Sequence, residues 1–369
     1  MERRAFIRIV GGGAILAAGV PVSGCSQAMP AEAVAPWQGP AAQGDLRRWL
    51  LGYAILAPHS HNLQSWLVDL SVSDRILLRC DLQRLLPETD PHSRQIMMSQ
   101  GTFIELLDLA ARERGYRTEV TLFPEGAFGP DKPDARPVAS IRLVADATVP
   151  QDPLFAQILQ RRTNRSAYDP ARAVPAQAWQ AMAAAAGTQA LRFGHLGPDQ
   201  PALLQQQRAL AADAWRIELV TPRTVMESYR LLRIGPDEVA RHRDGLTLLD
   251  PKVVWLDRLG LFDRSKPPAA DAYATTSQIE EFNAKIASTQ GFLWMVSADN
   301  ERATQVNAGR AYARVQLAAT AEGVVMQPLQ QALQEYAEQA APYAQIHRLL
   351  AERGQTVQMW ARVGYAPPV

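Results

Sequence analysis

An internal repeat sets the architecture that this chain can adopt. Residues 93–116, SRQIMMSQGTFIELLDLAARERGY, align without a gap with residues 301–324, ERATQVNAGRAYARVQLAATAEGV. Both copies carry an arginine near the start, a glycine in the middle and a glycine at the end: Arg94, Gly101 and Gly115 in the first, Arg302, Gly309 and Gly323 in the second. Two unrelated helices rich in alanine and leucine are the alternative. The coincident glycines and a shared Leu-Ala-Ala favour duplication of one structural unit.

Each copy of the repeat is predicted to form one long helix. Apolar residues recur at helical spacing, as Phe103, Leu106, Leu107 and Ala110 do in the first copy. The final glycine suits the left-handed position that ends many helices. Strand-like runs flank both copies, SWLVDLSV and RILLRCD in the first half and GFLWMVSAD and VQMWARVG in the second. We therefore expect an α+β or α/β chain of two pseudo-symmetric halves, with each long helix lying between a central sheet and the partner half.

The two predicted halves differ in length. We assign the first half to residues 45–150 and the second half to residues 151–369. The excess of the second half falls mostly within about residues 200–290, a charged segment that is punctuated by proline. Insertions of this length are usually functional, as lids are, or else disordered. Trp255 and Phe262 indicate packing onto another part of the chain, so we predict a lid.

The N-terminus is typical of an export signal. In residues 1–24 a charged ERRAFIR precedes an apolar stretch that is shorter than a membrane-spanning helix requires. The pair Arg3-Arg4 resembles a twin-arginine signal, and VSGC resembles a lipobox, whose cysteine, Cys25, is acylated. A simple secretory signal with a chance cysteine is the alternative. We expect a protein that is lipid-anchored on the periplasmic side of a bacterial membrane, with residues 25–44 as a flexible tether.

Charge and cysteine content argue against several other classes of protein. The net charge is +1 over 369 residues, which gives no sign of a nucleic-acid partner. If Cys25 carries lipid, Cys80 is left without an intramolecular disulfide partner, and its apolar surroundings indicate a buried, inert thiol. No carboxylate or third histidine lies at ligand spacing from His59 and His61, so no metal site is expected.

Two polar motifs carry the chemistry of a binding site. Residues 54–66 read AILAPHSHNLQSW, and residues 160–170 read QRRTNRSAYDP. Guanidinium groups such as those of the second motif form bidentate bonds with phosphate. A solvated helix start is the alternative for this motif. Asn62 and Gln64 supply amide donors and acceptors. Side chains two positions apart do not lie on the same face of a regular helix, so we expect an irregular helix start there.

Together with GRAYARVQLAATAEG, these motifs resemble the nitroreductase family of FMN proteins, and more specifically its Acg-like branch, in which two nitroreductase-type halves are fused. The resemblance spans roughly residues 45–369. It implies one composite FMN site per chain, at the interface of the halves. The implied phosphate contacts are Arg161, Thr163 and Arg165, and the implied ring contacts are Pro58, His59, Ser60, Asn62 and Gln64. Weaker implied contacts are Gly323, Gln327, Pro328 and Arg362.

The resemblance implies an FMN-dependent oxidoreductase that passes hydride or electrons to an electron-poor acceptor, nitro or quinone-like. No catalytic acid or base is assigned to the protein. The alternative is a non-catalytic protein that stores or sequesters flavin beneath a closed lid, and a third option is a binding module without flavin. Because the fused halves satisfy the interface of a nitroreductase dimer, we expect a monomer that mimics a homodimer.

Two residues depart from the family's ring-contacting motif. His59 stands where the family has serine, and Ser65 stands where the family has proline before tryptophan. His59 is therefore expected either to alter the electrostatics of the flavin or to point to solvent.

Overall fold

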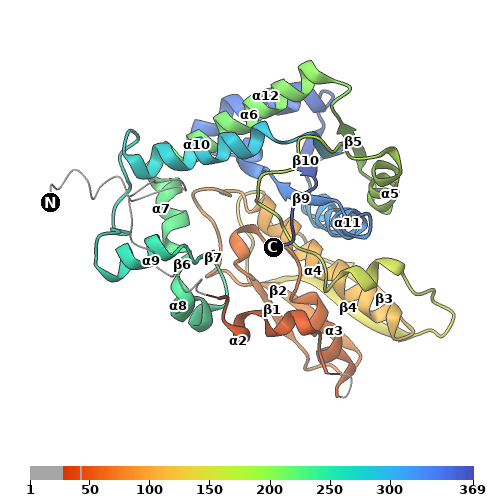
Figure 1. Ribbon diagram of the computed structural model, residues 1–369. Helices are drawn as coiled ribbons and strands as arrows, with labels where there is room; N and C mark the ends of the chain where they lie inside the picture. Colours follow the sequence, from red (N-terminus) through yellow and green to blue (C-terminus); the bar gives the residue numbers. More distant parts are fainter. Residues whose placement is uncertain (1–27, 42–43) are drawn as a thin grey trace.

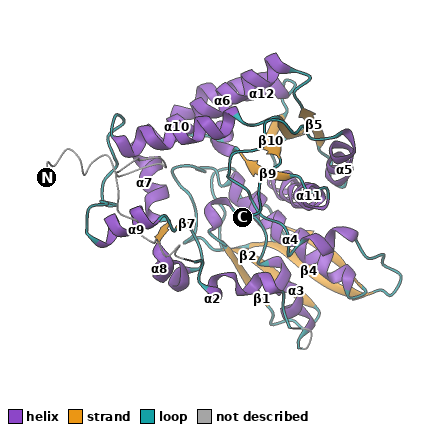
Figure 2. Ribbon diagram, in the orientation of Figure 1, coloured by secondary structure: helices purple, strands orange, loops and turns teal. Residues whose placement is uncertain are grey.

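The computed structural model describes residues 28–41 and 44–369 (Figure 1). The predicted export signal and Cys25 lie outside the described residues. The described part of the chain forms two four-stranded antiparallel sheets with helices packed between and around them (Figure 2). This architecture confirms the predicted α+β class.

The first half carries a sheet with the strand order β1-β2-β4-β3. Its elements are α3 (Leu46–Ala54), β1 (Trp66–Asp69), β2 (Arg75–Cys80), α4 (Arg94–Glu113), β3 (Tyr116–Leu122) and β4 (Pro137–Ala145). Asp45 begins α3, where its carboxylate accepts a hydrogen bond from the Arg47 N–H (2.8 Å). Burial raises the pKa of the Cys80 thiol to about 12, as expected for an inert cysteine.

The second half carries a sheet with the strand order β5-β8-β10-β9. Its strands are β5 (Arg192–Leu196), β8 (Gly291–Ser297), β9 (Val325–Pro328) and β10 (Thr356–Gly364), and its helices include α5 (Ala176–Ala186), α11 (Arg302–Ala321) and α12 (Ala340–Leu350). Strand β10 is buried along its whole length because β8 and β9 pair with its two edges and helices cover the sheet.

The helices α4 and α11, which are the two copies of the repeat, pack directly against each other between the sheets (Figure 1). They meet at the paired glycines. A Cβ atom on Gly101 would collide with the carbonyl oxygen of Val306, and a Cβ atom on Gly309 would collide with that of Met98. The glycines therefore allow the two backbones to touch.

Both copies also end as the repeat predicts. Gly115 follows α4 with φ of 71°, and Gly323 follows α11 with φ of 66°. These are left-handed conformations, which glycine adopts without a steric penalty.

The paired arginines at the starts of α4 and α11 hold the halves together reciprocally. Arg94 donates a hydrogen bond to the carbonyl of Leu333 in the second half (2.8 Å). Arg302 donates to the carbonyls of His92 (2.8 Å) and Pro130 (2.7 Å) in the first half. Each arginine thus donates hydrogen bonds to backbone carbonyl groups of the opposite half, as the repeat predicts for two equivalent units.

The predicted insertion has two parts. It contains α6 (Pro201–Val220), α7 (Pro222–Arg230), β6 (Leu232–Ile234), α8 (Gly235–His242), β7 (Leu246–Leu248), α9 (Pro251–Arg258) and α10 (Tyr273–Ala287). Leu210 of α6 and Phe282 of α10 belong to the same core as Trp360 of β10, so these helices are integral to the second half. The part between them reaches the first half, where the Glu227 carboxylate accepts hydrogen bonds from the Glu88 and Thr89 N–H groups (both 2.9 Å).

The predicted flexible tether is wrong for part of its length. Residues 31–38 form α2 (Ala31–Val34) and the 3-10 helix η2 (Ala35–Gln38), and Trp37 packs against the core of the first half. Among the described residues, no helix combines the length and the apolar character that crossing a bilayer requires.

Candidate functional site

The two polar motifs of the sequence meet at the interface of the halves. Residues 161–165, called here the arginine turn, lie against the end of α3. Arg161 donates a hydrogen bond to the carbonyl of Leu56 (2.8 Å) across this interface. The charge of Arg165 acts on His61, whose pKa is lowered to about 4, first by burial and then by this cation. The structure therefore brings together the segments from which a composite site was predicted.

The arginine turn forms a cationic cluster with Arg362. Arg161 and Arg362 are buried, which lowers the pKa of Arg161 to about 10 and also lowers that of Arg362, whereas the Arg165 residue is exposed. None of these three guanidinium groups has a carboxylate partner among the described residues. The Arg161 Nε and the hydroxyl of Tyr312 are buried there without a hydrogen-bond partner in the described part of the chain. Since buried charge requires compensation, the cluster is suited to an anion.

Gln316 and Tyr312 complete this cluster, and neither was predicted as a site residue. The Gln316 side chain accepts a hydrogen bond from Arg161 (3.1 Å) and donates to the carbonyl of Arg162 (3.3 Å) and the hydroxyl of Thr163 (3.4 Å). Tyr312 lies one turn earlier on α11, on the same helix face. A tyrosine and a glutamine four positions apart, and so on one face of the repeat helix, were the available signal.

Arg362 and Gln327 lie beside the arginine turn. The Arg362 guanidinium donates to the Gln327 side chain (2.8 Å) and to the carbonyl of Ser166 (2.7 Å). It therefore supports the turn through hydrogen bonds of its own. Pro328 is paired with Ala361 between β9 and β10, so it helps to fix the backbone beside Arg362.

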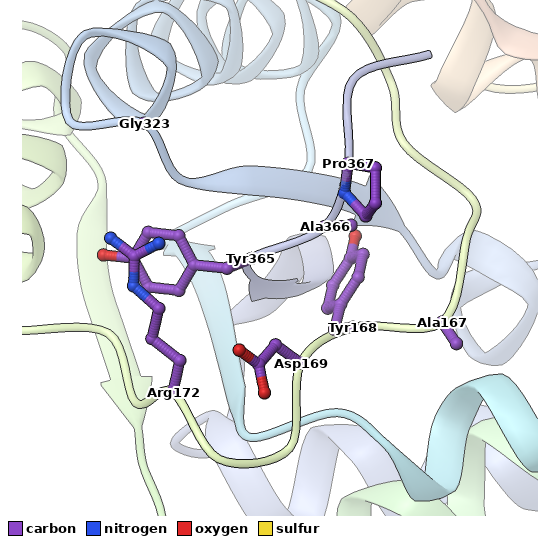
Figure 3. Close-up of a pocket in the computed structure, with 8 residues that line it drawn as sticks. All are labelled: Ala167, Tyr168, Asp169, Arg172, Gly323, Tyr365, Ala366 and Pro367. Atoms are coloured by element: carbon purple, nitrogen blue, oxygen red, sulfur yellow. The ribbon is translucent and has the colours of Figure 1, made fainter.

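Gly323 lies apart from the ring-contacting motif. It lines an open surface pocket in which the Arg172 guanidinium stacks on the Tyr365 ring, 3.4 Å from its centroid (Figure 3). The other residues of the pocket are Ala167, Tyr168, Asp169, Ala366 and Pro367. None of the predicted first-half contacts lines this pocket, so the structure does not join Gly323 to them.

The loop that carries the predicted ring contacts, residues 58–64, is strained as well as irregular. His61, Asn62 and Gln64 have φ values of 50°, 53° and 53°, and none of them is glycine. Left-handed conformations of such residues cost about 1–3 kcal/mol each and cluster at functional sites. The predicted irregular helix start is confirmed as η3 (Ser60–Asn62), which contains a kink at His61.

Hydrogen bonds to α4 hold this 58–64 loop in place. The Thr102 hydroxyl donates to the carbonyl of Pro58 (2.7 Å), and the Ser60 N–H donates to the Ser99 hydroxyl (3.2 Å). The loop is thus fixed to the helix that crosses α11, and through α11 its position depends on the packing of the two halves.

The two departures from the family's motif are partners of each other. The Nε2 atom of His59 accepts a hydrogen bond from the Ser65 N–H (3.1 Å) and lies 2.7 Å from the Ser65 hydroxyl. Its Nδ1 atom therefore carries the proton and donates to the carbonyl of Ser60 (2.8 Å). Burial lowers the pKa of His59 to about 4, which keeps the ring neutral. The histidine therefore holds the loop and does not point to solvent, and its effect on the electrostatics of a flavin stays a prediction.

The insertion covers the amides of the 58–64 loop. The Asn62 carbonyl accepts a hydrogen bond from the Gly245 N–H (3.1 Å), and the Asn62 side chain donates to the Gly245 carbonyl (3.4 Å). The Gln64 side chain donates to the carbonyl of Arg243 (2.8 Å). Both predicted ring contacts are therefore bound to the backbone of the insertion.

Comparison with sequences gives partial matches. No family model matches the chain. Over 119 residues the chain is 31% identical to two uncharacterized proteins of Mycobacterium tuberculosis, MT3212 of strain CDC 1551 / Oshkosh and Rv3127 of strain H37Rv. The match covers 31% of this chain and 33% of each relative, so the chain spans about a third of the length of the curated relatives it matches.

Solved structures that resemble the chain include nitroreductases. The FMN-dependent nitroreductase NfnB from Mycobacterium smegmatis, in complex with NADPH, is 18% identical with a TM-score of 0.35, over 57% of this chain and 86% of that one. A nitroreductase with bound FMN from Bacteroides fragilis is 13% identical with a TM-score of 0.33, over 58% and 89%. A putative nitroreductase from Anabaena variabilis is 11% identical with a TM-score of 0.37, over 79% and 69%.

Proposed function

We propose that this chain binds FMN at the interface of its halves and acts as an FMN-dependent oxidoreductase. The observation that carries the proposal is the arginine turn, a cationic cluster without carboxylate partners within residues 28–41 and 44–369 that lies against the strained 58–64 loop. A phosphate monoester is a dianion that arginine binds firmly. The amide side chains of the neighbouring loop have the chemistry that the polar edge of an isoalloxazine ring requires.

The residues present fit this cofactor at its phosphate end. The hydroxyl of Tyr312 and the Nε of Arg161, which find no hydrogen-bond partner in the part of the chain that the structure describes, lie beside Arg165, where an anion would compensate the buried charge of Arg161. Arg161, Thr163 and Arg165 would hold the phosphate, and Asn62 would face the ring once its contacts with the insertion are released. The flavin supplies hydride and electron transfer, and the protein supplies orientation and electrostatics.

An absorbance spectrum of the purified chain, before and after incubation with FMN, tests the proposal. We expect a flavin band that survives gel filtration, and mass spectrometry should identify FMN in the heat-released ligand. NAD(P)H should bleach the band, and a nitro or quinone compound should restore it. A chain that retains no FMN after incubation would contradict the proposal. The lipid anchor at Cys25, the periplasmic location and the monomeric state remain predictions of the sequence.

A second candidate function is flavin sequestration, which the contacts of the insertion favour. The insertion binds the Asn62 and Gln64 amides and is fastened nearby by Asp244. The Asp244 carboxylate accepts hydrogen bonds from Arg84 (2.9 Å) of the first half and from Arg233 (2.8 and 3.0 Å) of the insertion. A ring beneath this cover would be shielded from a second substrate, and the yellow protein would then bleach with dithionite but only slowly with NAD(P)H.

Substitution of Asp244 separates the two functions. Asp244→Asn keeps the shape of the side chain but removes the charge that Arg84 and Arg233 share, so the insertion should detach more readily. If the insertion limits access, the rate of flavin reduction by NADPH should rise by about tenfold, as expected for the loss of a charge-assisted hydrogen bond. Stopped-flow absorbance measures this rate. Asp250→Asn, at the N-cap of α9 in the same insertion, is the matched control. An unchanged rate in Asp244→Asn would argue against a gating role.

A further inference from the structure

The segment of residues 30–41, called here the N-terminal segment, packs on both halves of the chain. Its helix α2 lies against α8 of the insertion (Figure 1). Pro40 packs so closely on α3 that a Cβ atom on Gly52 would lie 2.7 Å from the Pro40 Cβ. Gly39 adopts a φ of 79°, and a Cβ atom there would lie 3.3 Å from Leu159. This close packing on two elements distinguishes the segment from a loose linker.

The side chain at the centre of the N-terminal segment reaches the arginine turn. The Arg162 guanidinium carbon lies 3.6 Å from the centroid of the Trp37 ring, and the Arg161 guanidinium carbon lies 5.3 Å from it. Both distances are within the range of a cation–π interaction. No carboxylate pairs with either arginine among the described residues, so the aromatic face is the electrostatic partner that the structure offers to Arg162.

The Arg162 guanidinium is also bonded to the backbone of the turn. It donates hydrogen bonds to the carbonyls of Arg161 (2.7 Å) and Leu159 (3.0 Å). The Trp37 ring therefore covers a cation that fixes the two carbonyls at the entry to the arginine turn. Restricting this backbone also restricts the directions in which the side chains of Arg161 and Arg165 leave it.

We propose that Trp37 is a positioning residue for the anion site: through Arg162 it holds the arginine turn in the conformation that binds the phosphate of FMN. The assignment rests on the proposed function. It gives the N-terminal segment, which leads from the predicted lipid anchor, a role in cofactor binding. In the absence of Trp37, Arg162 is free to turn toward water, and the backbone of the turn loses one of its restraints.

The test compares Trp37→Ala and Trp37→Phe with Trp255→Ala, which removes a tryptophan of α9 that is 61% exposed. Flavin fluorescence gives dissociation constants for FMN and for riboflavin, which lacks the phosphate, with the full chain stripped of flavin. We expect Trp37→Ala to weaken FMN binding about tenfold and riboflavin binding by less than about twofold. Trp37→Phe keeps an aromatic face and should restore most of the FMN affinity, and Trp255→Ala should match the wild type.

Equal weakening of both flavins by Trp37→Ala, or an unchanged FMN constant, would overturn the assignment, because a general loss of structure does not select the phosphate. If Trp37→Ala does not fold, Arg162→Met removes the stacked cation instead and should show the same difference between FMN and riboflavin. Again, equal losses would overturn the assignment.

If the wild-type chain binds neither flavin, the proposed function is contradicted, and the role of Trp37 is then tested separately. Inorganic phosphate is then the probe, and the thermal midpoint of unfolding is the measurement. A rise with phosphate in the wild type that is lost in Trp37→Ala supports the positioning role. The same rise in both chains, or no rise in either, overturns it.

Discussion

The variant Gly309→Ala is expected to lose at least about 3 kcal/mol of the free energy of unfolding, or not to fold at all. The added methyl group would collide with the backbone carbonyl of Met98 on α4. A backbone carbonyl in a buried helix cannot turn aside as a flexible side chain can, so α4 and α11 must separate. Gly101→Ala should behave in the same way, since its methyl group meets the carbonyl of Val306. Urea denaturation followed by circular dichroism measures the effect.

Gly187→Ala is the matched control for these two substitutions. Gly187 ends α5 with φ of −64°, and a Cβ atom there would lie 3.5 Å from the nearest atom, which is ordinary contact. Its free energy of unfolding should stay within about 0.5 kcal/mol of the wild type. Wild-type stability in Gly309→Ala would show that the helices do not cross at the paired glycines.

Arg165→Ala is expected to weaken FMN binding roughly 10- to 100-fold without a loss of stability, because it removes a charge-assisted contact with the phosphate. The Arg165 side chain makes no hydrogen bond with the rest of the described chain, so its removal leaves no buried group unpaired. Arg161→Ala should lower both FMN affinity and stability, since it strips the Leu56 carbonyl of its donor. Equilibrium dialysis against FMN, combined with thermal unfolding, separates the two effects.

Arg172→Ala is the control for the loss of a nearby arginine. Arg172 lies in the surface pocket of Figure 3, where it stacks on Tyr365. Its FMN constant should equal that of the wild type. If Arg165→Ala also retains FMN unchanged, the phosphate does not bind at the arginine turn, and the proposed site is wrong.

Local patterns in the sequence were sufficient to predict much of the fold. Helical spacing predicted α4 and α11, and the glycines that follow them predicted their left-handed ends. The spacing of Asn62 and Gln64 predicted an irregular backbone, which their positive φ values confirm. Each of these features depends on residues within a few positions of one another, because helix geometry and backbone sterics act at that range.

Periodicity and motif spacing predicted the two long helices, the strands that flank them, and the arginines and amides of the candidate site. The folded chain adds the partners of these residues: His59 is held by Ser65, the Gln64 amide by Arg243, and the arginine turn by Trp37 through Arg162. Two of these pairs join residues that are more than a hundred positions apart, and the third depends on a strained loop. Such contacts form when packed elements bring distant side chains together, and spacing along the chain does not encode that proximity.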